Sequence, residues 1–139
     1  MRCVLATDED RAVVTHILRH LNERGVRVER LPTGIWAKVA LAAAHAVSEK
    51  RVDFAIVCCW TGTGVCIAAN KVTGVRAALS VDRETAVGAR KWNDANVLAI
   101  SLRLLSEPVA TEILDAWLDT PYGGTEDESL FAIRAEEAL

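Results

Sequence analysis

The segment VDFAIVCC (52–59) is the most apolar strand-like stretch of the chain and restricts the fold more than any other feature. The shorter run CVLAT (3–7) also lacks the polar alternation of a half-exposed strand. Apolar runs of this kind are typical of strands buried on both faces, as in a parallel sheet covered by helices. We therefore expect 52–59 to be a central strand of such a sheet.

Segments with helical periodicity separate the strand-like ones. Val13, Ile17 and Leu21 recur on one helical face, and Gly25 follows as the end of that helix. The other predicted strands are 26–31, 75–81 and 97–100, and the other predicted helices are 35–50, 83–92, 107–119, one that begins near Val65, and a last one over 125–139. This order predicts an α/β fold with a doubly wound, five-stranded parallel sheet in one domain, residues 1–139. Such sheets bind ligands beyond the carboxyl ends of their strands, and we expect that edge to carry 7–8, 59–64, 80–82 and the loop around Asn93.

Charge and hydropathy exclude several classes of partner. A chain of 139 residues with a formal charge of −3 carries no basic footprint, so we expect no nucleic-acid partner. The N-terminal MRCVLATDEDR lacks the apolar run of a signal peptide, and no stretch is apolar enough to span a membrane. We expect a cytoplasmic protein whose four cysteines are reduced thiols.

Two specific interpretations of the glycine-rich stretch GTGVCIA (62–68) are weak. It fits a loose dinucleotide pattern, and Asp82 could be the ribose-binding carboxylate, but that pattern normally follows the first strand and this one follows the third. Cys58 and Cys59 are neighbours that point to opposite faces of a strand, so we expect no metal site there.

A more general chemistry fits the same loop. Glycines after a strand let successive backbone N–H groups converge, and the helix near Val65 adds its positive end. Such a turn stabilises either a bound phosphate or an oxyanion that develops during a reaction. Cys59 lies on the lip of this turn, where a thiol can act as a base or nucleophile. A cysteine at a buried strand end is also a common core residue, and position alone leaves both interpretations open.

Four segments of the chain resemble motifs of one enzyme family. They are ATD (6–8), CWTGTGVCIAANKVTGVRAAL (59–79), KWNDANVLAI (91–100) and ILDAWLDTPYGG (113–124). Together they resemble the ribose-5-phosphate isomerase B family, which includes the galactose-6-phosphate isomerase subunits, over nearly the whole chain. The resemblance implies a Rossmann-like three-layer sandwich, no cofactor, and a homodimer or tetramer with active sites shared between subunits.

The resemblance also implies a reaction and residues that perform it. The family interconverts aldose and ketose sugar phosphates by moving a proton between adjacent carbons through an enediolate. By this resemblance the catalytic residues are Cys59 as the base, Thr61 for proton handling and ring opening, and Gly62 and Gly64 for the anion hole, while Asp8, Asn93 and Arg103 contact the substrate.

The departures from the family pattern are concentrated at these site positions. Glu9 stands where the family has a histidine, and Trp92 replaces the histidine assigned to ring opening. Trp60 replaces a glycine, and Trp36 replaces a tyrosine. The tail GGTEDES (123–129) carries acidic residues where the family has arginines for the substrate phosphate. Carboxylates at such positions repel a phosphate dianion, although they also suit the first turn of a helix.

These departures predict an altered substrate. Indole rings at 36, 60 and 92 suit the C–H faces of a sugar, so Trp60 and Trp92 are further candidate substrate contacts. Glu9 is another, because it stands at a family site position. We expect an isomerase of carbohydrate metabolism that keeps the Cys59 machinery and takes an unphosphorylated or otherwise altered sugar in place of ribose 5-phosphate. Without the ring-opening histidine, an open-chain substrate also fits. The alternative is an inactive sugar-binding or interaction homologue. We also expect the helix 125–139 to pack on a partner subunit.

Overall fold

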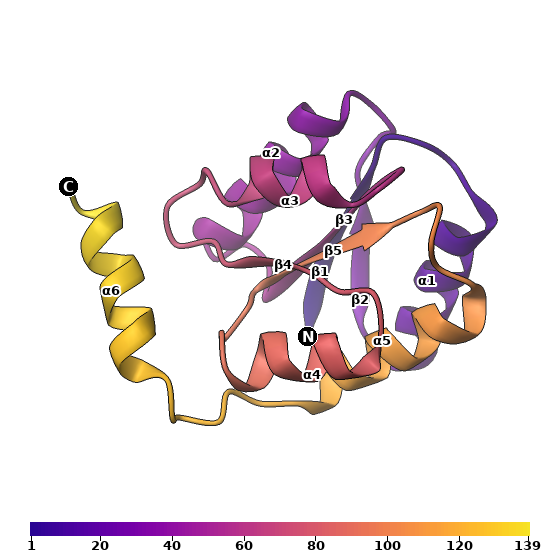
Figure 1. The fold of residues 1–139 in the computed structure, drawn as a ribbon. Coiled ribbons are helices and arrows are strands. Elements are labelled where there is room, and N and C mark those ends of the chain that lie inside the picture. Colours follow the sequence, from indigo (N-terminus) through magenta and orange to yellow (C-terminus); the bar gives the residue numbers. More distant parts are fainter.

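The computed structural model describes residues 1–139 as a five-stranded parallel sheet in the order β2-β1-β3-β5-β4 (Figure 1). The strands are β1 Arg2–Thr7, β2 Arg27–Arg30, β3 Phe54–Cys59, β4 Ala77–Leu79 and β5 Val97–Ser101, and the helices are α1 Ala12–Glu23, α2 Trp36–Ser48, α3 Thr63–Ala69, α4 Arg83–Lys91, α5 Glu107–Asp119 and α6 Asp127–Glu137. The predicted order of elements is confirmed, with β3 at the centre of the sheet.

Helices cover both faces of the sheet. Helices α2 and α3 pack on one face, and α1, α4 and α5 pack on the other (Figure 1). Successive side chains of β3 alternate between the two cores, so Cys58 belongs to the α1/α4/α5 core and Cys59 to the α2/α3 core. The expectation that the two adjacent thiols point to opposite faces is therefore confirmed.

The parallel strands define a carboxyl edge and an amino edge of the sheet. Thr7 pairs with Cys58 and Cys59 pairs with Ser101, so the ends of β1, β3 and β5 meet at the carboxyl edge. The loop that carries Trp92 and Asn93 follows α4 and precedes β5, which places it at the amino edge. The prediction that the Asn93 loop lies at the same edge of the sheet as Cys59 is wrong within a single chain. The length of β5, about 15 Å, separates the two.

The C-terminal helix α6 stands apart from the sandwich (Figure 1). Leu130 is its only buried residue, while Phe131 and Leu139 are exposed. The predicted last helix is confirmed; Glu126 occupies its N-cap, and no side chain caps the helix. No helix of the chain has both the length and the apolar character needed to cross a membrane.

Candidate active site

The turn between β3 and α3 is held against β5 by Gly62. Gly62 has a φ of 76°, a left-handed conformation that favours glycine. A Cβ atom there would lie 2.6 Å from the Leu79 side chain and 2.9 Å from backbone atoms of Ile100 and Ser101. The chain therefore needs a glycine at this point both for the backbone conformation and for the close approach to β5.

This turn leaves a continuous run of backbone N–H groups without acceptors. The amides of residues 60–65 donate no hydrogen bond within the chain, and the first N–H of α3 to find an acceptor is that of Cys66, which donates to the Gly62 carbonyl at 3.3 Å. The positive end of α3 lies among them. Groups arranged in this way are ready to stabilise a negatively charged oxygen.

Of the two adjacent cysteines, only Cys59 belongs to this turn. It is the last residue of β3, it directly precedes the free amides, and its exposed fraction is 6%. Cys58 is completely buried, and burial followed by the nearby Cys59 thiol raises the pKa of Cys58 far above its ordinary value. Cys58 is therefore an inert core thiol, and Cys59 is the thiol that lies beside the anion-stabilising turn.

Asp8 lies at the same edge and has an oxygen with no partner. Its backbone N–H donates to the Cys58 carbonyl at 3.3 Å, which fixes the end of β1 beside the end of β3. The Oδ1 atom is buried without a hydrogen bond. Burial, and after it the neighbouring Glu9, raises the pKa of Asp8 above its ordinary value. A carboxylate oxygen in this state can accept a hydrogen bond from a ligand hydroxyl group.

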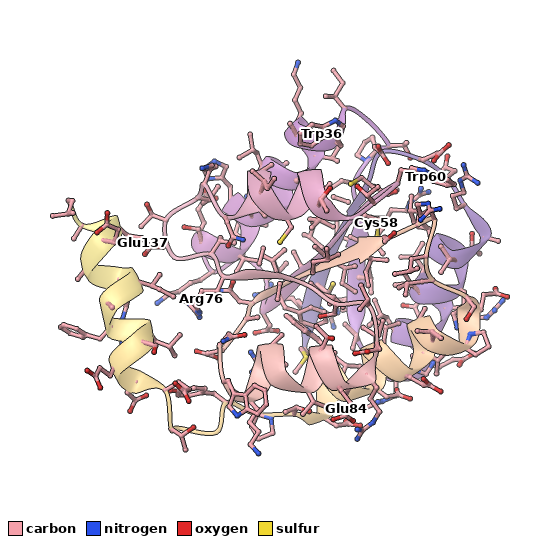
Figure 2. All side chains as sticks on the ribbon, in the orientation of Figure 1. Trp36, Cys58, Trp60, Arg76, Glu84 and Glu137 are labelled. Carbon is pink, nitrogen blue, oxygen red and sulfur yellow. The ribbon has the colours of Figure 1, made fainter.

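Thr61 and the two indoles complete the surroundings of the turn. The Thr61 and Thr63 hydroxyl oxygens lie 2.7 Å apart, so one donates to the other. Trp36 packs on Gly64, where a Cβ would meet the indole at 2.9 Å. Trp60 is half-exposed at the carboxyl edge, whereas Arg76 and Glu137 lie toward the amino edge (Figure 2).

Glu9 and Arg103 reach this edge from the two strands beside β3. The Glu9 carboxylate accepts from Arg11 at 3.0 Å. Arg103 follows β5, and its backbone N–H donates to the Trp60 carbonyl at 3.0 Å. The Arg103 side chain is exposed and forms no ion pair. The structure thus brings Glu9 and Arg103 to the edge of Cys59, as well as Asp8, Trp60 and Thr61.

Two clefts of the single chain lie away from Cys59. One of about 1130 Å³ opens at the amino edge, between Asp53, Arg90 and Arg134. The other, of about 570 Å³, runs between α6 and the β4 side of the sheet and is lined by Trp92, Asn93 and Leu130, among others. Cys59 lines neither of these two clefts.

Two contributors to the site were not predicted from the sequence. The Arg11 guanidinium lies 4.8 Å from the centre of the Trp60 ring. The buried Ser101 hydroxyl donates to the Trp60 carbonyl at 3.0 Å. Ser101 could have been found, because it directly follows the predicted strand 97–100. Arg11 could not, because its contact with Trp60 depends on how two loops fold over the sheet.

Asp82, the residue that a dinucleotide site would use, has a structural role. Its Oδ1 atom accepts from the Thr85 N–H at 2.8 Å and from the Thr85 hydroxyl at 2.7 Å, which caps α4. These hydrogen bonds lower the pKa of Asp82 below its ordinary value. The carboxylate therefore stabilises the start of a helix.

We expect Asp82→Ala to lower the melting temperature by about 3–6 °C at neutral pH, because it removes an N-cap. The pKa of Asp82 is lowered on folding, so its contribution is present at neutral pH and is lost as the pH falls through the folded value. The deficit should therefore shrink in acid, and isomerase activity should stay within about twofold of wild type. Thermal unfolding at several pH values checks this, and a large loss of activity would contradict the purely structural role.

We expect Asp8→Asn to raise the melting temperature at neutral pH while it lowers activity. The pKa of Asp8 is raised on folding, so its ionisation destabilises the folded chain as the pH rises through that value. Asparagine removes this cost. The gain in melting temperature should disappear when the pH is below 3.8, the ordinary pKa of an aspartate. Loss of a charged acceptor should lower kcat/KM at least about 10-fold. Parallel melting curves and initial rates check both effects, and a fall in stability at neutral pH would contradict this explanation.

The observed fold is a parallel α/β sandwich in which a thiol, Cys59, lies beside a turn whose backbone amides have no acceptor. The sequence model of the Ribose/Galactose Isomerase family matches residues 3–132. The chain therefore belongs to this family, and it is an isomerase of the sugar-phosphate, aldose–ketose class.

Individual relatives agree with this assignment. The chain is 40% identical to D-erythrulose-4-phosphate isomerase of Pectobacterium atrosepticum over 78% of this chain and 75% of the relative. It is 40% identical to ribose-5-phosphate isomerase B of Escherichia coli over 87% of this chain and 85% of that protein. The solved structure of Clostridium thermocellum ribose-5-phosphate isomerase B superposes with a TM-score of 0.95 at 32% identity, over 99% of this chain and 98% of that one.

Proposed function

We propose that the chain interconverts an aldose and a ketose with Cys59 as the catalytic base. The thiolate takes the proton from the carbon next to the substrate carbonyl, and the C–H electron pair moves into an enediolate. The proton then returns to the neighbouring carbon. The observation that carries this proposal is the run of free N–H groups at 60–65, directly after Cys59. They stabilise the oxyanion that forms when the proton leaves.

Other groups at the edge serve the remaining steps. The Thr61 hydroxyl, which already shares a hydrogen bond with Thr63, relays a proton between the two substrate oxygens. Gly62 and Gly64 let the turn approach the substrate closely and present its amides. The unpartnered Asp8 oxygen accepts a hydrogen bond from a sugar hydroxyl group. No step in this scheme needs a metal or a cofactor.

The substrate that suits these residues best is a short, open-chain sugar phosphate. Trp92 stands where the family has the histidine assigned to ring opening. A four-carbon sugar with phosphate on O4 cannot form a five-membered ring, because the oxygen that would close the ring is esterified. Such a substrate makes a ring-opening group unnecessary. One of the relatives is named as an isomerase of D-erythrulose 4-phosphate, which is a sugar of this size.

The second wall of the site comes from a second copy of the chain. Cys59 and Asn93 are both site positions by resemblance, yet they lie at opposite edges of one sheet. A dimer that turns the amino edge of one subunit toward the carboxyl edge of its partner brings them together. The exposed Phe131 and Ile133 of α6 provide apolar surface for the same contact.

Solvent exchange tests the proposed reaction. The chain is incubated in deuterated water with D-erythrose 4-phosphate, D-ribose 5-phosphate and the corresponding unphosphorylated sugars. We expect deuterium on the carbon next to the carbonyl, fastest with the four-carbon phosphate. Fastest exchange with ribose 5-phosphate would contradict the substrate assignment alone. Tight binding without label from any sugar would support an inactive sugar-binding homologue, a role that the low exposure of Cys59 would then explain.

Mixed dimers test the shared site. Cys59→Ala and Asn93→Ala chains are each expected to be inactive, and a mixture that has exchanged subunits should recover about a quarter of wild-type activity, since half of the dimers are mixed and each has one intact site of two. Cys59→Ala mixed with Cys59→Ser serves as the control that cannot complement, because neither chain supplies the thiol. Activity no greater than the sum of the separate variants would show that Asn93 does not act across the interface.

A further inference from the structure

We propose that Asp94 is a positioning residue for the reaction, which holds the neighbouring Asn93 in place through a clamp formed by Arg76 and Arg90. This inference rests on the proposed function, in which Asn93 completes the site at Cys59 of the partner subunit. The proposed proton transfer uses neither Asp94 nor the two arginines. Their contacts instead fix the loop that carries Asn93.

The backbone at Asp94 has a conformation that costs free energy. Its φ is 46°, and Asp94 is one of only two residues other than glycine that have a positive φ in this chain. Aspartate adopts the left-handed conformation more readily than most residues, but that conformation is still sparsely populated. Residues of this kind persist only where surrounding contacts hold them, and they are concentrated at functional sites. The contacts of Asp94 therefore indicate what the loop is held for.

Two guanidinium groups from different segments hold the Asp94 side chain. Arg90, on α4, donates from Nη1 to Asp94 Oδ1 at 3.2 Å, and Arg76, just before β4, donates from Nη2 to Oδ2 at 3.3 Å. Arg76 also donates from Nε to the Asp94 backbone carbonyl at 2.8 Å. Each carboxylate oxygen thus has its own cationic donor, and the main chain of the same residue is bound as well.

The two arginines are themselves fixed. The Arg90 guanidinium lies 5.6 Å from the centre of the Trp117 ring on α5, and its Nε donates to the Thr120 carbonyl at 3.2 Å. Trp117 is only 4% exposed, so this contact is anchored in the core. The backbone of Arg76 is held by Asn96, whose Oδ1 accepts from the Arg76 N–H at 2.7 Å. The clamp therefore ties the loop to α5 and to the segment before β4.

Asn93 and Asp94 face different surroundings although they are neighbours. Asn93 is exposed, whereas the Asp94 side chain is 37% exposed and pairs with both arginines. A side-chain amide at the surface contacts a substrate productively only where the backbone presents it at a fixed place. A misplacement of about 1 Å can lower a rate about 100-fold. The clamp supplies the fixed place and leaves the Asn93 side chain accessible to a ligand.

Asp94→Asn tests the clamp, because asparagine tolerates the left-handed backbone but turns an NH2 group toward one of the two guanidinium groups. We expect kcat/KM with D-erythrose 4-phosphate to fall at least about 10-fold. Asp115→Asn is the matched control. The Asp115 carboxylate on α5 also has two cationic partners, Arg24 and His20, both at 2.7 Å, and its side chain is 41% exposed. This control should stay within about twofold of wild-type activity.

Mixed dimers separate the positioning of Asn93 from damage to the whole chain. An Asp94→Asn chain keeps its own Cys59, so a Cys59→Ala partner, whose loop is intact, should restore one of the two sites in each mixed dimer. We expect about a quarter of wild-type activity from the exchanged mixture, as for Asn93→Ala. If Asp94 served the Cys59 site of its own subunit, or only the stability of its own chain, the Cys59→Ala partner would restore nothing.

Amide hydrogen exchange follows the loop without relying on turnover. The N–H groups of Asp94 and Ala95 donate to carbonyls of α4 at 3.3 and 3.0 Å. We expect both amides to exchange at least about 10-fold faster in Asp94→Asn, while the amides of β3 keep their wild-type rates. Asp94→Gly should show the same increase and the same loss of kcat/KM, because glycine suits the backbone conformation but lacks the carboxylate.

Wild-type kcat/KM in Asp94→Asn would overturn the positioning role, as would an equal loss in Asp115→Asn. Full activity in Asp94→Gly would show that the backbone conformation alone matters. A Cys59→Ala partner that rescues Asn93→Ala but not Asp94→Asn would show that Asp94 does not act through Asn93. Failure of the proposed reaction has a different signature: the loop amides exchange faster in Asp94→Asn, but the wild-type chain labels no sugar. The clamp on the loop then stands, and the isomerase proposal fails.

Discussion

Cys59→Ala is expected to lower kcat at least about 1000-fold, the range of losses seen when a catalytic base or nucleophile is removed. The thiol is the one reactive group placed next to the free amides of residues 60–65. Alanine removes the base and leaves the turn in place, so the oxyanion site remains while proton removal stops. Because Cys59 is a small side chain at a strand end, the free energy of unfolding should fall by no more than about 1–2 kcal/mol. Initial rates and urea unfolding measure the two quantities.

Cys58→Ala is the matched control for this result. Cys58 precedes Cys59 on the same strand and is fully buried on the other face, in the α1/α4/α5 core. Its loss should destabilise the chain by a similar amount through the cavity that it leaves, while kcat stays within a few-fold of wild type, roughly. If the two variants lose activity equally, the chemistry does not belong to Cys59 and the loss reflects damage to β3.

Gly62→Ala is expected to destabilise the chain by about 3 kcal/mol or more and to abolish activity. The new Cβ would lie 2.9 Å from backbone atoms of Ile100 and Ser101, which cannot move aside as a flexible side chain could. It would also hold a non-glycine residue at a φ of 76°. The turn must shift to relieve both, which removes the amides from Cys59. Chemical denaturation and isomerase rates check this expectation.

Gly25→Ala separates the two causes. Gly25 has nearly the same φ, 77°, but a Cβ there would meet nothing within 4 Å. We expect Gly25→Ala to lower the free energy of unfolding by about 1 kcal/mol, from backbone conformation alone, and to leave activity unchanged. A Gly62→Ala variant that is no less stable than Gly25→Ala would show that the close approach to β5 is not a constraint.

The layout of the fold could be predicted from the sequence because its determinants are local. The unbroken apolar character of 52–59 indicates a strand covered on both faces, and the glycines after it indicate a turn that opens a helix. Cys59 and the anion-stabilising turn follow from the same short stretch, since only a few residues and one helix end are involved. The confirmed order of strands and helices places both at one edge of the sheet.

The remaining features depend on contacts between distant segments. The position of Asn93 was misassigned because α4 runs back along the sheet and carries the loop after it to the opposite edge. Motif similarity does not reveal at which edge, or in which subunit, a residue acts. The stacking of Arg11 on Trp60 joins two loops about fifty residues apart in sequence. The charge run TDED gives no indication of it, because such runs are normally solvated.

In the proposed mechanism, the groups that face the developing oxyanion are main-chain amides, and every residue type except proline supplies one. Side chains around the turn can therefore be exchanged during evolution while the electrostatic stabilisation of the intermediate is inherited unchanged. Under that mechanism, an indole at position 60 and acidic residues in the tail are compatible with unchanged proton-transfer chemistry. Members of such a family can diverge in which sugar they accept while the reaction stays the same.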